Sequence, residues 1–79
     1  MNPLCEAFAT DFVMECPQNG TIGDARWLCQ EGFAYYSPRG CESEYAAVIV
    51  CATEAAFDCV TGTVAGCDAL RDAVLACAP

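Results

Sequence analysis

The chain has 79 residues, with eleven acidic side chains, three arginines, no lysine and no histidine, and a formal net charge of −8. A chain this short forms at most one domain, which we expect to span residues 1–79. The acidity argues against nucleic-acid binding, and the longest apolar run is far below the roughly 20 residues that span a bilayer. Without histidine the usual general base near neutral pH is missing, so we expect a non-enzymatic protein with no cofactor and no metal.

Eight cysteines are spread over the whole chain, a pattern that in so short a sequence predicts a disulfide scaffold. The closest of them are eight positions apart, whereas thiol redox motifs and zinc or iron–sulfur sites use close-set pairs. Each bond can contribute about 2–4 kcal/mol, as much as a core of this size supplies. Disulfides persist in oxidising compartments, which predicts an extracellular or periplasmic protein. The cysteines expected to be structural are Cys5, Cys16, Cys29, Cys41, Cys51, Cys59, Cys67 and Cys77.

The first half of the chain predicts a helical hairpin over residues 1–36. Asn2 can cap a helix, the proline after it suits the first helical position, and apolar residues then recur at helical spacing as far as Cys16. PQNG ends this helix, because proline cannot continue it and Asn-Gly favours a turn. A second helix is predicted from about Asp24, as N-cap or in the first turn, to Tyr36, where SPRG breaks it.

The second half predicts another helical hairpin, over residues 41–77. CESEYAAVIVCATEAAFDC contains a long apolar run, and its acidic start and helix-forming end favour a helix from about Glu42 to Asp58 despite the β-branched residues. VTGTVAG predicts a turn, and CDALRDAVLAC predicts a final helix. A helix that is apolar on every side belongs at the centre of a bundle, unless one side meets another subunit or a ligand. We therefore predict an all-α, disulfide-stapled bundle of about four short helices.

The last five cysteines are spaced symmetrically, with one CX9C unit on each side of Cys59. On a helix, nine intervening residues place two sulfurs about 15 Å apart and about 80° around the axis, so an antiparallel helix with the same spacing can be bonded at both ends. This spacing favours the nested bonds Cys41–Cys77 and Cys51–Cys67, with Cys59 bonded to the first half. A rival scheme joins Cys59–Cys67 and Cys51–Cys77 and leaves Cys41 for the first half.

CESEYAAVIVC and CDALRDAVLAC resemble the paired units of twin CX9C (coiled-coil-helix-coiled-coil-helix) proteins. The resemblance covers residues 41–77 and implies an antiparallel helical hairpin with two nested disulfides. Tyr45, Val48 and Ile49 resemble that family's recognition element for oxidative import, which implies the mitochondrial intermembrane space as an alternative location and needs no signal peptide. The alanine-rich composition and the cysteine layout also resemble small cysteine-rich secreted proteins of myxobacteria, which implies a fold and a location but no activity.

Two groups of side chains are candidates for contacts with a partner. In FAYYSPRG, Tyr35 and Tyr36 point about 100° apart on a helix, so one of them is expected at the surface beside Arg39. Tyrosine and arginine are typical anchors of protein interfaces. The remaining aromatic side chains, Trp27 included, are expected in the core. The second group comes from the apolar run of the third helix and consists of Val48, Ile49 and Val50.

These features favour a secreted, non-enzymatic structural or interaction protein that binds a protein partner, or itself, through an apolar helix face. The alternative is a carrier of a small apolar, lipid-like ligand held between the helices. A thiol–disulfide sensor is a weaker alternative. The residues expected to line a ligand site in the carrier are Phe12, Val48, Ile49 and Phe57.

Overall fold

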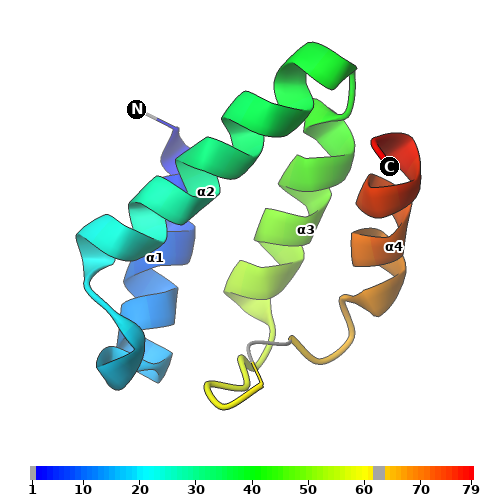
Figure 1. Cartoon of the computed structure of the whole chain (residues 1–79). Coiled ribbons are helices and arrows are strands. Elements are labelled where there is room, and N and C mark those ends of the chain that lie inside the picture. Colours follow the sequence, from blue (N-terminus) through cyan, green and yellow to red (C-terminus); the bar gives the residue numbers. More distant parts are fainter. Residues whose placement is uncertain (1, 62–63) are drawn as a thin grey trace.

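The protein is described by a computed structural model that covers residues 2–61 and 64–79 (Figure 1). The described part of the chain is helical, apart from its connecting turns and an isolated antiparallel bridge between Phe57 and Val64. The predicted all-α, disulfide-stapled fold with four main helices is confirmed. In chain order the elements are α1 (Pro3–Glu15), η1 (Pro17–Asn19), α2 (Ile22–Tyr36), η2 (Ser37–Arg39), α3 (Glu42–Glu54) and α4 (Asp68–Cys77).

The starts of α1 and α2 are set by local capping. The Asn2 side chain accepts a hydrogen bond from the N–H of Leu4 at 3.0 Å, which confirms Asn2 as the cap of α1. Helix α2 begins at Ile22, slightly before the predicted start near Asp24, because Thr21 is its N-cap. The N–H of Asp24 donates to Thr21 Oγ1, and the N–H of Thr21 donates to the Asp24 carboxylate. This reciprocal capping box satisfies two N–H groups at the start of α2 and places Asp24 in the first turn.

Helix α3 ends at Glu54, so the prediction that it continues to Asp58 is wrong. The backbone becomes extended at Ala55, with φ −99° and ψ 166°. The loop that follows carries Cys59 to Cys16 at the end of α1, where the two form a disulfide. Helix propensity amounts to less than about 1 kcal/mol for each residue, so a covalent bond to another part of the chain outweighs it. The predicted turn VTGTVAG includes residues 62 and 63, which lie outside the described residues.

The disulfides connect every main helix to a neighbour. Two bonds join α3 to α4, one joins α1 to α2, and one ties the end of α1 to the loop after α3: Cys41–Cys77, Cys51–Cys67, Cys5–Cys29 and Cys16–Cys59. The α3–α4 hairpin thus carries the nested pair that the CX9C spacing favours, and no bond of the rival scheme is formed. Four disulfides indicate an oxidising compartment. None of the described helices has both the length and the apolar character that crossing a bilayer requires.

The centre of the bundle is α3, which packs against α1, α2 and α4 and lies between α2 and α4 in Figure 1. This agrees with the central position that its apolar sequence predicts. Of the main helices, α4 packs against α3 alone. The core is small and much of it is sulfur. Its main cluster consists of Cys5, Cys29, Phe33 and Ile49, with Leu4, Phe8, Tyr45 and Ala46 packed against it.

Candidate interaction surface

Helix α2 turns one side to the core and the opposite side to solvent. Cys29 is buried and bonded to Cys5, and Ala25 and Phe33, one turn before and after it, are buried as well. Three buried residues one helical turn apart define the inner side of a helix, and so they define its outer side too. The exposed residues on that outer side, which we call the α2 outer face, are Asp24, Trp27, Leu28, Glu31 and Tyr35.

Large apolar side chains lie on this face. Trp27 and Leu28 are each 59% exposed, and Tyr35 is 45% exposed. The prediction that Trp27 lies in the core is therefore wrong. Trp27 precedes Cys29 by two positions, which on a helix is about 160° around the axis. Because Cys29 is held inward by its disulfide, Trp27 must point outward. The side of α2 that faces inward follows from the Cys5–Cys29 bond, which the sequence alone does not give.

Arg39 ends the α2 outer face on the C-terminal side. Its guanidinium lies 3.7 Å from the centre of the Tyr35 ring, and it donates a hydrogen bond to the carbonyl oxygen of Tyr35. The prediction that one of the adjacent tyrosines lies at the surface beside Arg39 is confirmed. Tyr36 is half-buried and stacks on Tyr45, with ring centres 5.0 Å apart. The cation–π contact holds Tyr35 in place, which lowers the entropy that a partner would have to remove.

The apolar run of α3 does not form a continuous exposed face. Ile49 is 5% exposed and belongs to the core, so it is not available to a partner. Val48 is half-buried, and Val50 is 39% exposed. Consecutive helical residues point in different directions, so three in a row cannot share one side. Of the three residues proposed from the sequence, Val50 alone lies on the exposed surface.

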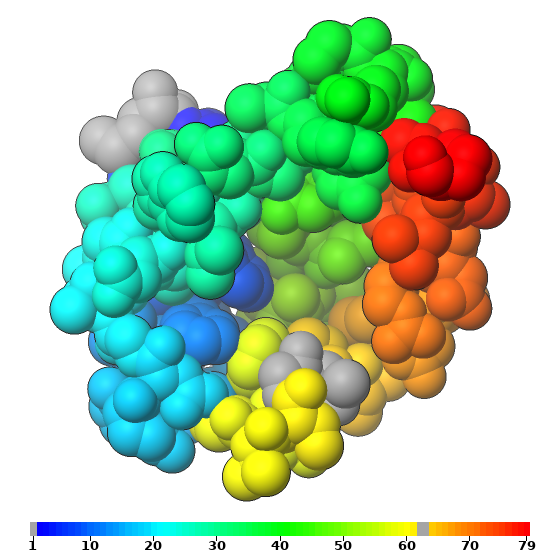
Figure 2. Space-filling model, in the orientation of Figure 1, coloured from blue at the N-terminus to red at the C-terminus, as the bar shows by residue number. Residues whose placement is uncertain are grey.

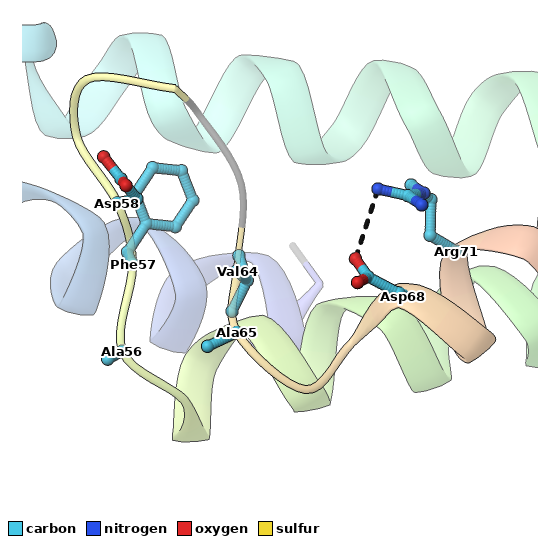
Figure 3. Close-up of a pocket in the computed structure, with 7 residues that line it drawn as sticks. All are labelled: Ala56, Phe57, Asp58, Val64, Ala65, Asp68 and Arg71. Carbon is cyan, nitrogen blue, oxygen red and sulfur yellow. Dashed lines mark ion pairs between the residues drawn. The ribbon is translucent and has the colours of Figure 1, made fainter.

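A hollow in the surface of the bundle is a second candidate site. Figure 2 shows a face hollowed over α3, with α2, α4 and the loop after α3 around it. Within this region a groove of about 540 Å³ opens between that loop and the start of α4 (Figure 3). Asp68 and Arg71 form an ion pair at its α4 side, with N and O 3.3 Å apart. The lining mixes apolar and charged residues: Ala56, Phe57, Asp58, Val64, Ala65, Asp68 and Arg71.

The residues predicted to line an apolar ligand site are not gathered at this groove. Phe57 lines it, and the Phe12 ring meets the Phe57 ring edge-on at 4.9 Å between centres. Ile49 lies in the core instead. Asp58 sits at the groove with its carboxylate accepting hydrogen bonds from the N–H groups of Thr61 and Val60, which lower the pKa of Asp58 below its usual range. The groove therefore keeps a charged side chain beside Phe57.

One cluster near the start of α3 has the residue types of a metal site. The Sγ atoms of Cys41 and Cys77 and a carboxylate oxygen of Glu44 lie within 4.8 Å of one another. The two sulfurs are bonded to each other, however, and a metal requires free thiolates. In the oxidised protein this cluster is therefore a disulfide with a carboxylate beside it.

No protein-family model, curated protein or solved structure matches this chain. The α2 outer face consequently stands on its own geometry: exposed aromatic and aliphatic side chains on a helix whose opposite side is fixed by a disulfide.

Proposed function

We propose that this protein is a secreted, non-enzymatic interaction protein, a disulfide-stapled scaffold that presents the α2 outer face to a protein partner. The observation that supports this proposal most is that large apolar side chains are exposed while smaller side chains fill the interior. Trp27, Leu28 and Tyr35 are exposed, whereas the fully buried side chains of largest volume are cysteines. Burying a large apolar side chain stabilises a fold by about 1.5–3 kcal/mol, so leaving three of them outside has a cost that contact with a partner would recover.

The exposure of the charged side chains supports the non-enzymatic part of the proposal. Catalytic acids and bases generally sit in places where burial and neighbouring charges shift their pKa values strongly. Among the described residues, no polar or charged side chain is buried. Burial raises the pKa of the Tyr45 hydroxyl, with a smaller contribution from Tyr36, but this only keeps Tyr45 neutral within an aromatic cluster.

The proposed location is extracellular or periplasmic, in line with the four disulfides. The mitochondrial intermembrane space remains the alternative, and its support is the likeness of the nested α3–α4 hairpin to twin CX9C proteins. Fractionation of the source cells, followed by detection of the oxidised chain, distinguishes the two locations.

The test compares binding by three versions of the oxidised protein. Each is immobilised and exposed to native secreted proteins, and retained proteins are quantified by mass spectrometry. We expect a partner that the wild type retains and that the Trp27→Ala/Leu28→Ala variant loses by at least about tenfold, since truncation of two central anchors removes about 2 kcal/mol or more. The matched control is Leu75→Ala, which removes a side chain of α4 that is 51% exposed. Identical retention by all three proteins contradicts the proposal.

A carrier of a small apolar ligand is the second candidate, and the groove between the loop after α3 and α4 favours it. Its Phe57 and Val64 offer an apolar wall. Displacement of a fluorescent fatty acid would be weakened by Phe57→Ser and unaffected by Trp27→Ala if the groove binds such ligands. Absence of any saturable binding removes this candidate.

A further inference from the structure

Two carboxylates run along the middle of the α2 outer face. Asp24 and Glu31 are seven positions apart, which on a helix is two turns and about 10.5 Å along the axis. Both are exposed. Helical periodicity places Trp27 on one side of this acidic row and Leu28 and Tyr35 on the other. The face is therefore an acidic row between two apolar borders.

The arginines of the chain do not neutralise this row. Arg26 forms an ion pair with Glu6 of α1, with Nε and the carboxylate oxygen 2.9 Å apart. Arg71 forms ion pairs within α4, and Arg39 stacks on Tyr35. In the described part of the chain, neither Asp24 nor Glu31 takes part in an ion pair. The chain has no lysine and a net charge of −8, and Arg39, which stacks on Tyr35, is the arginine that lies at the end of this face.

These charges disfavour a second copy of the chain as the occupant. A two-fold dimer brings the same surface of both subunits together, so the two acidic rows would lie against each other. Like charges set opposite one another across an interface disfavour association, and the net charge of −8 makes each whole chain repel the other as well. The apolar borders favour contact, while the acidic row selects a partner of opposite charge.

We propose that the α2 outer face binds a basic amphipathic helix of another protein. Lysine or arginine side chains two turns apart on that helix pair with Asp24 and Glu31, and its apolar side chains cover Trp27, Leu28 and Tyr35. This inference rests on the proposed function, since it names the class of partner for the same face. A helix packed along an exposed helical stripe is an established mode of peptide recognition.

The sole tryptophan of the chain, Trp27, lies on the face, so its fluorescence reports occupation directly. The probe is a synthetic amphipathic peptide of leucine and lysine, about five helical turns long and free of tryptophan. Its matched peptide has glutamate in place of lysine. We expect the lysine peptide to shift Trp27 emission to shorter wavelength in a saturable way, and its Kd to rise at least about tenfold between low and high salt. The glutamate peptide should leave the emission unchanged.

Variants separate this face from the general acidity of the chain. Glu31→Gln should raise the Kd of the lysine peptide by about three- to tenfold. Glu54→Gln, which removes the same charge from an exposed position on α3, should leave it unchanged. Equal effects of the two variants, or an unchanged emission spectrum, would overturn the inference.

Sedimentation of the chain alone tests whether a second copy occupies the face instead. A dimer that Leu28→Ser dissolves and Glu31→Gln strengthens would keep the α2 outer face as an interface while replacing the basic partner with a second copy. Failure of the proposed function would be seen in a different experiment: the wild type and the Trp27→Ala/Leu28→Ala variant would retain the same secreted proteins.

Discussion

The two helical hairpins of this protein are both cross-linked by disulfides, yet they are stabilised differently. Between α1 and α2, the Cys5–Cys29 bond lies inside the main hydrophobic cluster, and the Glu6–Arg26 ion pair adds a second contact. Between α3 and α4 there are two bonds, but within α4 itself Val74 is the buried residue. A disulfide inside a core combines packing with covalent constraint, whereas a disulfide at the margin of a core supplies mainly constraint.

Removal of single disulfides should produce the largest difference between the hairpins. We expect Cys5→Ala/Cys29→Ala to lower the free energy of unfolding by about 4–5 kcal/mol, because a cavity is left in the core as well as a looser unfolded state. Cys41→Ala/Cys77→Ala should cost about 2–3 kcal/mol, since Cys51–Cys67 still closes the α3–α4 hairpin. Urea unfolding measures both values.

Hydrogen exchange sharpens this comparison. In Cys41→Ala/Cys77→Ala, protection should fall in α4 while α1 and α2 keep theirs, because α4 packs against α3 alone. Loss of protection in α1 and α2 of this variant would show that the two hairpins are stabilised as one unit. Mass spectrometry of the unreduced variants controls for reshuffling of the remaining bonds.

Gly32 tests the packing between the hairpins. A Cβ atom at Gly32 would lie 2.0 Å from the hydroxyl oxygen of Tyr45, and the ring atoms behind it are also within contact. Gly32→Ala should therefore lower the free energy of unfolding by about 1–3 kcal/mol, despite the higher helix propensity of alanine. At Gly23, in the same helix, the nearest atom to such a Cβ is Thr21 Oγ1 at 3.6 Å. Gly23→Ala should stabilise by up to about 1 kcal/mol, and equal destabilisation by both variants would contradict this account.

The ion pairs should give a smaller difference. Arg26 and Glu6 connect α1 to α2 with side chains that are 34% and 32% exposed, whereas Arg71 and Asp68 lie within α4 at 51% and 73%. We expect Arg26→Gln to lower the free energy of unfolding by about 0.5–1 kcal/mol, and Arg71→Gln by less than about 0.5 kcal/mol. High salt should reduce both effects, and a larger loss in Arg71→Gln would reverse the comparison.

The pH dependence of two aspartates should have opposite signs. Hydrogen bonds from Thr61 and Val60 lower the pKa of Asp58. Ionised Asp58 therefore stabilises the folded state above the ordinary pKa of 3.8, and this stabilisation is lost as the pH falls through the lowered pKa of the folded state. Partial burial, followed by the hydrogen bond and charge of Glu15, raises the pKa of Asp11, so protonation there favours the folded state. We would measure the free energy of unfolding from about pH 6 to pH 2. In Asp58→Asn it should decrease less at the acidic end than in the wild type. In Asp11→Asn the free energy of unfolding should fall more steeply as the pH decreases. If the pH dependence is unchanged in both variants, both expectations are wrong.

Local sequence determined most of the secondary structure. The capping residue Asn2, the proline and glycine turns and the helical spacing of apolar residues predicted four helices, because caps and turns depend on neighbours in the chain. The CX9C spacing favoured the nested bonds of the α3–α4 hairpin. Two antiparallel helices with the same distance between their cysteines bring both pairs of sulfurs together. The placement of a surface tyrosine beside Arg39 was predicted for the same reason, because Tyr35 and Arg39 are only four positions apart in the chain.

Tertiary structure decided what lies far apart in the sequence. The end of α3 at Glu54 depends on Cys59 reaching Cys16, and the exposure of Trp27 depends on Cys29 being bonded to Cys5. A helical wheel tells which residues share a side but does not say which side faces inward. The long-range bond fixes that orientation, because Cys29 can bond to Cys5 only if its side of α2 faces α1.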